Sequence, residues 1–295
     1  AVGSSRRVWV TIRETLVLLC IAIGLTPAFK MKFWNIGAEG QILMGGMATA
    51  ALMIYAGDAM PNWLLLILIF IASAAAGLIW GLIPAVFKLM LNYVAMQLVT
   101  FAIVFWENPS GSNTVGIINA AGQKGWFPSI FGNMYGLNVI VVLIITLGMY
   151  VYMKYSKQGY EIAVVGESQN TARYAGINVK KVIIRTMMLS GAICGIAGCL
   201  IVSGASHTIS TSTAGGRGFT AIIVAWMSKF NPFAMILVSA FLVFMQQGSI
   251  QIASQFGLNE NASDIITGIL LFFLIGCEFF INYKLEWKKN HKEGK

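Results

Sequence analysis

Apolar stretches of membrane-crossing length recur along almost the whole sequence, and this pattern restricts the possible folds more than any other feature. Hydrophobic residues make up 57% of the 295 residues and charged residues 11%, whereas soluble domains carry about 25% charged residues. A spanning helix needs about 20 predominantly apolar residues. We count about nine spanning or half-spanning segments, at residues 11–27, 37–57, 63–87, 89–106, 139–153, 182–203, 219–227, 232–248 and 264–283. The sequence therefore predicts an all-α, polytopic transmembrane helix bundle that forms one domain over residues 1–295.

Charges between these segments predict how the chain is oriented in the membrane. Residues 154–185 carry six Lys or Arg against two Glu, and the tail at residues 284–295 is also basic. An excess of Lys and Arg in short loops marks the cytoplasmic side. Residues 107–138 are rich in Gly, Asn, Ser and Pro, and we expect them to form the main external loop. Because the basic residues lie in loops and tails instead of on one face, we expect no nucleic acid partner.

Two places indicate further residues in the full protein. The first segment runs from outside to inside in this topology, which leaves Arg6, Arg7 and Arg13 on the outer side, against the positive-inside rule. A tenth helix upstream would remove this conflict. The third and fourth segments meet at Lys88 and Leu89 with no residues left for a turn, although helix connections need about 2 to 8. We therefore expect a polar cytoplasmic loop between these two residues.

The order of the segments predicts two inverted repeats. Four segments precede residues 139–153 and four follow, so the second set begins on the opposite side of the membrane from the first. The repeats cover residues 11–106 and 182–283.

The second member of each repeat is interrupted by glycine, at residues 35–46 and 215–225. Each also carries one ionisable residue near its start, Glu39 in the first and Arg217 in the second. Paired broken segments of this kind point to the pathway of a transported substrate.

A long polar segment, residues 154–185, separates the fifth apolar segment from the sixth. Ser168 can cap the start of a helix, and Gly176 can close it in a left-handed conformation. The residues between them predict a helix of about two turns. So short a helix is marginal alone in water, which indicates that packing on the membrane domain or on another protein holds it.

Two stretches carry a resemblance to a known family. Residues 166–179, GESQNTARYAGINV, resemble the coupling segment of bacterial ABC-importer permeases for branched-chain amino acids, ribose and nucleosides. Residues 33–41, FWNIGAEGQ, are similar to the nucleoside branch, the one associated with basic membrane lipoproteins. Together with the order of the other segments, the resemblance covers nearly the whole chain.

The resemblance implies a permease subunit of an ATP-driven importer, multi-pass in the bacterial cytoplasmic membrane. In that family the coupling segment docks on cytoplasmic ABC ATPase subunits; the cofactors, ATP and Mg, are expected there and none in this chain. A second permease subunit, identical or homologous, and an extracytoplasmic solute-binding protein or lipoprotein are the other implied partners. The implied ATPase-coupling residues are Glu167, Ser168, Asn170, Thr171, Ala172, Arg173, Tyr174 and Gly176. We expect an arginine at position 172 to block docking without disturbing the fold.

Polar residues inside the broken or neighbouring segments are candidates for the substrate pathway. They are Asn35, Glu39, Gln41, Asn92, Tyr93, Gln97 and Arg217. We expect Asn92 and Gln97 broadly on one side of their helix, where amides can hydrogen-bond a sugar hydroxyl, a base edge or another helix. Glu39 either caps a helix that begins after Gly37 or lines a water-filled route. The sequence leaves both alternatives open.

No motif supports catalysis by this chain itself. The phosphate-binding loop G-x-x-x-x-G-K-[ST] is absent, so ATP hydrolysis is expected on a separate subunit. His207 and His291 have no Cys, Asp or Glu at ligand spacing, and we assign no metal. The alternative to an importer subunit is an ion-coupled secondary transporter or channel, which should show a relay of ionisable residues at membrane depth. Within the importer class, ribose-like sugars and branched-chain amino acids are alternatives to a nucleoside.

Overall fold

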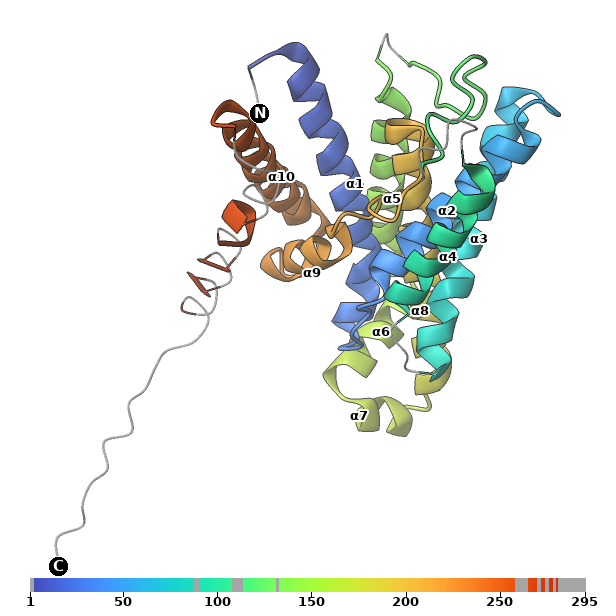
Figure 1. The fold of residues 1–295 in the computed structure, drawn as a ribbon. Helices are drawn as coiled ribbons and strands as arrows, with labels where there is room; N and C mark the ends of the chain where they lie inside the picture. Colours follow the sequence, from blue (N-terminus) through green and yellow to red (C-terminus); the bar gives the residue numbers. More distant parts are fainter. Residues whose placement is uncertain are drawn as a thin grey trace, which may run out of the picture. The chain divides into compact units, whose positions relative to one another are not determined.

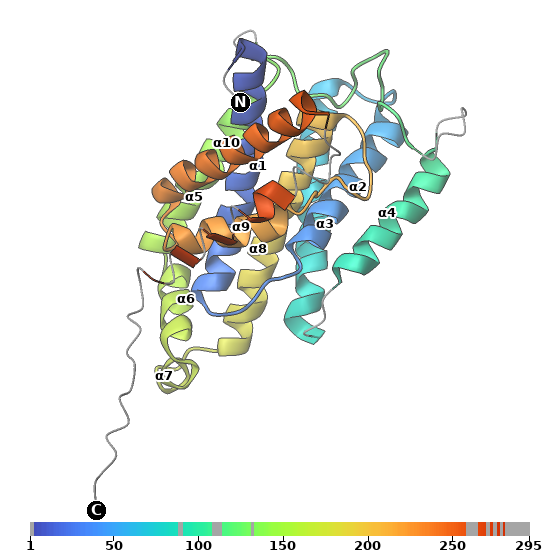
Figure 2. The same ribbon diagram turned by 60° about the vertical axis from the view of Figure 1, so that its left-hand side comes forward.

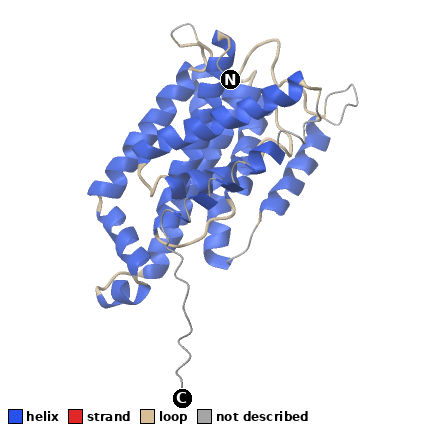
Figure 3. Ribbon diagram, turned by 90° about the vertical axis from the view of Figure 1, so that its left-hand side faces the viewer, coloured by secondary structure: helices blue, strands red, loops and turns tan. Residues whose placement is uncertain are grey.

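The computed structural model describes residues 3–87, 91–107, 114–130, 133–257, 265–269, 272–273, 276–277 and 280. In this part of the chain the secondary structure is helical, apart from one isolated bridge between Ile130 and Asn133 (Figure 3). The helices are α1 (Ser5–Lys30), α2 (Ala38–Ala56), α3 (Asn62–Phe87), α4 (Asn92–Trp106), α5 (Gly136–Tyr155), α6 (Lys157–Glu167), α7 (Gln169–Tyr174), α8 (Val179–Ile201), the π-helical turn η1 (Val202–Ser206), α9 (Arg217–Met227) and α10 (Pro232–Gln255). The predicted all-α membrane bundle is confirmed.

The chain forms two compact units, which divide within α10 after Phe241. Five helices of the described part are long and apolar enough to cross a membrane: α1, α3, α5, α8 extended by η1, and α10. In the larger unit α8 is the central helix and packs against α1, α2 and α3 (Figures 1 and 2). Its most apolar stretch is 78% buried, against 28% for α3 and 22% for α5. The side of α3 that faces away from α8 and the side of α5 that faces away from α1 are therefore available to lipid.

Glycine permits the close approach of α8 to its neighbours. A Cβ added at Gly195 would collide with the carbonyl oxygen of Ser73, and one added at Gly191 would collide with that of Gly77. Backbones in contact at this distance leave no space for a side chain between them. Gly191 and Gly195 thus form a small-residue face of α8 that contacts α3.

Several predicted boundaries move by a few residues for physical reasons. The first helix does not end at Pro27 but continues to Lys30, because a proline carbonyl still accepts a helical hydrogen bond, here from the N–H of Met31 at 3.3 Å. The polar segment contains α6 as well as the predicted short helix. The external loop ends earlier than predicted, because α5 begins at Gly136.

Other predictions lie wholly or partly outside the described residues. These include the junction at Lys88 and Leu89, most of segment 264–283, where residues 265–269 are helical, and the tail at 284–295. The inverted repeat therefore stays a prediction. Its second members, α2 and α9, are both present as helices shorter than the spanning ones around them, with 19 and 11 residues.

We predict that replacing Gly195 by Ala lowers the midpoint of thermal unfolding in detergent. The added methyl group forces α8 away from α3, and overpacking of this kind costs about 1–3 kcal/mol. Gly148→Ala in α5 is the matched control, because a Cβ there meets nothing within 4 Å and alanine is the better helix former by about 0.5–1 kcal/mol. Equal midpoints for the two variants would contradict the packing described for α8.

Candidate functional site

The polar segment folds into two short helices joined at Ser168. The N–H of Ser168 donates to the carbonyl of Val164 and closes α6, while its hydroxyl accepts the N–H of Thr171 at 3.2 Å and opens α7. α7 ends at Tyr174, and Gly176, which follows the C-cap residue Ala175, has a φ of +75°. There the N–H of Ile177 donates to the carbonyl of Ala172 at 2.9 Å, as in a Schellman motif. The predicted cap and left-handed closure are both observed.

An apolar cluster holds α7 on the membrane domain. We call it the support cluster; it consists of Met31, Ile162, Val165, Ala172, Val179 and Val182, all of them buried. These residues come from the end of α1, from α6 and α7, and from the start of α8. An ion pair of 2.8 Å between Arg185 of α8 and Glu161 of α6 adds to the same connection. Packing on the membrane domain therefore stabilises a helix of this length.

The burial of Ala172 corrects one expectation. Its side chain is 0% exposed beneath α7, so an arginine at this position would have to be accommodated inside the support cluster. An unpaired buried charge is strongly destabilising. Ala172→Arg would thus disturb the fold, and it cannot serve as a probe of docking.

Most of the other predicted coupling residues lie on the outer face of this turn. Ser168, which caps α7, is half-buried. The exposed coupling residues are Glu167, Asn170, Thr171, Arg173, Tyr174 and Gly176. Tyr174 is 93% exposed, so its ring is available to contact another protein. α6 and α7 lie at one end of the larger unit, where α1 and α5 end and α8 begins (Figure 1). The turn is thus packed on its inner side and accessible on its outer face.

At the start of α2, two predicted pathway residues bond to each other. The side-chain amides of Asn35 and Gln41 exchange two hydrogen bonds of 3.2 Å, and Asn35 also donates to the hydroxyl of Ser190 in α8 at 2.9 Å. Asn35 and Gln41 are 1% and 0% exposed. In this conformation their amides stabilise the break before α2 and are not open to a solute.

The structure separates Asn92 from Tyr93 and Gln97. Asn92 faces α2, where its amide donates to the carbonyl of Ile36 at 2.8 Å and accepts the N–H of Gly40 at 3.0 Å. It thereby satisfies two backbone groups that the break leaves free. Tyr93 and Gln97 are exposed on the surface of α4. Five residues turn an α-helix by about 500°, which is about 140° beyond one full turn. Asn92 and Gln97 therefore do not share a face.

Glu39 joins the beginnings of α2 and α9. It lies in the first turn of α2, and its Oε1 accepts the N–H of Gly218, in the first turn of α9, at 2.7 Å. Gly216, the residue before α9, has a φ of +74°, which favours glycine. The positive ends of two helix dipoles therefore converge on one carboxylate. Sequence reasoning considered a cap for α2 alone, whereas the observed hydrogen bond caps α9.

Arg217, the other predicted ionisable residue, pairs with Glu14 of α1. Its guanidinium donates twice to Oε2 of Glu14, at 2.8 and 3.2 Å, and also to the carbonyl of Thr213 at 3.0 Å. The opposite oxygen of Glu14 accepts from Arg13 at 2.6 Å. A cation at a helix N-terminus is unfavourable by itself, so the two nearby carboxylates, of Glu14 and Glu39, offset this effect.

Sequence reasoning missed Glu14 and two tryptophans. Glu14 is 203 residues from Arg217 in sequence, and next to Arg13 it resembles an ordinary local ion pair. Trp34 and Trp226 meet edge to face with ring centroids 5.1 Å apart, and both are partly exposed, at 57% and 46%. Trp34 is part of the motif at residues 33–41, so its position was available from the sequence although its partner was not.

Groups of three or more His, Cys, Asp or Glu that could hold a metal ion do not occur among the described residues.

Comparison with known proteins gives a family and several relatives. The sequence profile of the family described as "Branched-chain amino acid transport system / permease component" matches residues 10–275. The guanosine ABC transporter permease protein of Bacillus subtilis is 28% identical over 90% of this chain and 79% of its own length. A nucleoside ABC transporter permease protein of Lactococcus lactis is 25% identical over 97% of this chain and 83% of its own length. A glucose ABC transporter permease protein of Haloferax volcanii is 27% identical over 92% of this chain and 76% of its own length. No solved structure matches the chain.

Proposed function

The chain belongs to the family of branched-chain amino acid transport system permease components, and from this premise we propose that it forms the pathway for a nucleoside in an ATP-driven importer. It is a multi-pass protein of the cytoplasmic membrane and a permease subunit of the ABC importer class. The observation that carries the nucleoside assignment is the match over 90% and 97% of this chain to permeases named for guanosine and for nucleosides. A sugar is the second candidate, because the glucose permease covers a similar share of the chain.

The exposed face of α7 is the proposed contact with a cytoplasmic ATPase subunit. The support cluster beneath it includes Met31 from α1 and Val179 from α8. A displacement of α7 would therefore move α1 and the central helix α8. ATP and Mg would be held by the ATPase, and this chain would contribute only the docking face.

α1 provides a continuous mechanical connection from the docking face to the proposed pathway. It carries Met31 directly after its last residue and Glu14 about 17 residues earlier, or about 26 Å along the helix axis. Glu14 is bonded to Arg217 of α9, whose first turn is bonded to Glu39 of α2. We propose that tilting α1 separates the starts of α2 and α9 and so opens the route.

The same region provides polar and aromatic groups suited to a nucleoside. Glu39 is partly exposed, and a carboxylate can accept hydrogen bonds from ribose hydroxyls or from a base. Trp34 and Trp226 present ring surface on which a base can stack. A second permease subunit and an extracytoplasmic binding protein complete the proposed importer.

An ion-coupled carrier is the less favoured function. Its mechanism needs ionisable groups that form a relay through the membrane. In the described part of the chain, Arg13, Glu14 and Arg217 satisfy one another locally at the beginning of α9. This arrangement supports a structural connection and not a proton path.

We predict that the importer reconstituted with its ATPase and binding protein hydrolyses ATP faster with nucleosides than with ribose or leucine, and that Tyr174→Ala removes this stimulation. Truncating a central interface tyrosine costs about 2 kcal/mol or more, which corresponds to about thirtyfold weaker docking. Phosphate release gives the rate.

Tyr160→Ala is the matched control for this experiment, because Tyr160 is also exposed, at 66%, but lies on α6. Both variants should unfold at the temperature of the wild type. Stimulation by leucine alone would reject the nucleoside, whereas full stimulation in Tyr174→Ala would reject the docking face.

We further predict that Glu39→Gln slows nucleoside uptake into vesicles several-fold for each folded molecule, in addition to any loss of stability. Glutamine retains an oxygen that accepts the N–H of Gly218 but lacks the charge that attracts substrate donors. A role as a cap alone would give a loss of about 0.3–1 kcal/mol of stability for each helix end with normal uptake per folded molecule. Asp58→Asn, which removes an exposed charge outside this region, is the control. Uptake at the wild-type rate would exclude a pathway role for Glu39.

A further inference from the structure

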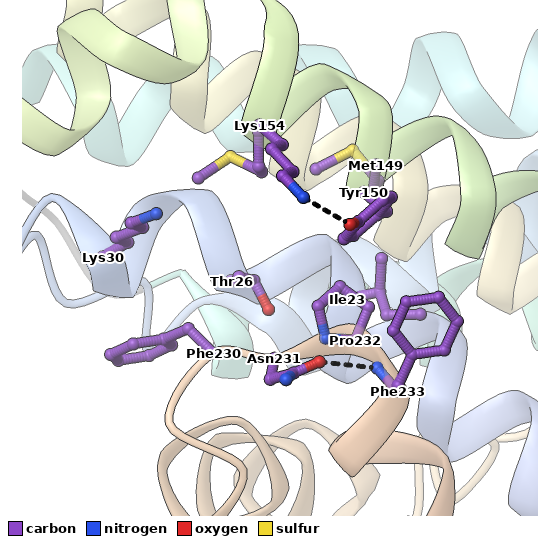
Figure 4. Close-up of a pocket in the computed structure, with 11 residues that line it drawn as sticks. Ile23, Thr26, Lys30, Met149, Tyr150, Lys154, Phe230, Asn231, Pro232 and Phe233 are labelled. Carbon is purple, nitrogen blue, oxygen red and sulfur yellow. Dashed lines mark hydrogen bonds between the residues drawn. The ribbon is translucent and has the colours of Figure 1, made fainter.

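A cavity of about 430 Å³ lies between α1, α5 and the turn that joins α9 to α10 (Figure 4). From α1 it is lined by Ile23, Thr26 and Lys30, which are spaced along one helical face. The rest of the lining is Met149, Tyr150, Met153, Lys154, Phe230, Asn231, Pro232 and Phe233. None of the predicted pathway or coupling residues is among them.

The cavity has a cationic end. Lys30 is the last residue of α1, and Lys154 is the next to last residue of α5. The Nζ of Lys154 donates to the hydroxyl of Tyr150 at 2.9 Å and lies 5.2 Å from the centre of that ring (Figure 4). Within the described residues neither lysine forms a salt bridge. Two ammonium groups therefore border the same space, and no carboxylate of the described residues is paired with either.

The α9–α10 turn adds a further positive end. Asn231 caps α10, its Oδ1 accepting the N–H of Phe233 at 3.0 Å, and α10 begins at Pro232. The positive end of the helix dipole is thus at the cavity. Lys229 and Phe230 before it have φ values of +47° and +60°, which fix the sharp change of direction.

The remaining lining is apolar. Ile23, Met149, Met153, Phe230 and Phe233 supply aliphatic, thioether and aromatic surface. Phe233 packs edge to face on Tyr150 with ring centroids 5.3 Å apart, although its side chain remains 53% exposed. A small inorganic anion would contact the lysines and leave this surface in water. An amphiphile with an anionic head and a hydrocarbon tail would use both parts.

The position of the cavity along the membrane helices agrees with such a ligand. Lys30 and Lys154 end two membrane-length helices on the side where α6 and α7 project (Figure 1), the side that the loop charges predict to be cytoplasmic. Lysines at this depth lie at headgroup level. The apolar lining from Ile23 and Met149 lies toward the hydrocarbon, because these residues precede the lysines by seven and five positions.

We propose that this cavity binds the phosphate headgroup of an anionic phospholipid of the cytoplasmic leaflet. Lys30 and Lys154 contact the phosphate, and an acyl chain runs along Met149, Phe230 and Phe233. The bound lipid would connect α1 and α5 to the α9–α10 turn. The proposal is independent of which solute the protein carries.

The test compares two double variants of the full-length protein in detergent, titrated with phosphatidylglycerol and observed by native mass spectrometry. Lys30→Gln with Lys154→Gln removes both cations of the cavity and keeps polar side chains at both positions. Lys180→Gln with Lys181→Gln removes two exposed charges at the start of α8 and is the control. We expect the cavity variant to bind phosphatidylglycerol about tenfold or more weakly and the control to match the wild type. Equal affinity in both variants would overturn the proposal.

Two further measurements identify the ligand. Phe233→Glu keeps both lysines and places a carboxylate in the first turn of α10, which is compatible with folding but repels an anionic lipid, so weaker binding is expected here too. Millimolar inorganic phosphate should leave phosphatidylglycerol bound. Displacement by inorganic phosphate would show a free-anion site and overturn the lipid assignment, as would equal affinity for phosphatidylcholine.

Discussion

A helix that begins inside a membrane domain leaves backbone N–H groups without partners, and lipid offers none. Both α2 and α9 begin within the larger unit, so each start must be satisfied by other elements. Asn92 of α4 bonds the backbone on both sides of the break before α2, and Glu39 of α2 accepts the N–H of Gly218 in α9. The two breaks therefore stabilise each other. The need to satisfy these backbone N–H groups fixes how α2, α4 and α9 meet.

The glycine face of α8 makes this arrangement possible. Because α8 approaches α3 and α2 at backbone distance, the short helix α2 is held along its length and not only at its ends. α1 covers another side of α8 and connects the support cluster under α7 with the ion pair at the beginning of α9. A force applied at α7 has a direct route to the junction of α2 and α9, which is where a solute would pass in the proposed importer.

Features that depend on local sequence were predictable. Ser168 and Gly176 define α7 through capping chemistry that acts over three or four residues. The apolar run at residues 63–87 gives the bounds of α3 within one residue. The family resemblance at residues 166–179 indicated the same turn. Even here the buried face was not evident, because Ala172 is small enough to suit either an exposed or a packed position.

Features that depend on distant partners were not predictable from the sequence alone. Asn92 has the polarity of a pathway residue, but its role depends on the backbone of α2, 52 positions away for Gly40. The structural role of Glu14 depends on its ion pair with Arg217, which lies in the second half of the chain. The cavity at Lys30 and Lys154 likewise needs three segments to meet, although the spacing of the residues on α1 and α5 is regular. Sequence patterns identify such groups as polar residues in or beside membrane segments without identifying what they contact.

Cross-linking the starts of α2 and α9 tests the central claim most directly. A Cβ at position 218 would lie 3.2 Å from the Cβ of Ala38, close to the separation of about 3.5–4.5 Å found in disulfides. In a chain whose native cysteines, Cys20, Cys194, Cys199 and Cys277, are replaced by serine, Ala38→Cys with Gly218→Cys should form an intramolecular disulfide on mild oxidation. Denatured protein would then show no free thiol and migrate as a monomer. Two free thiols after oxidation, with folding and uptake intact, would contradict the junction.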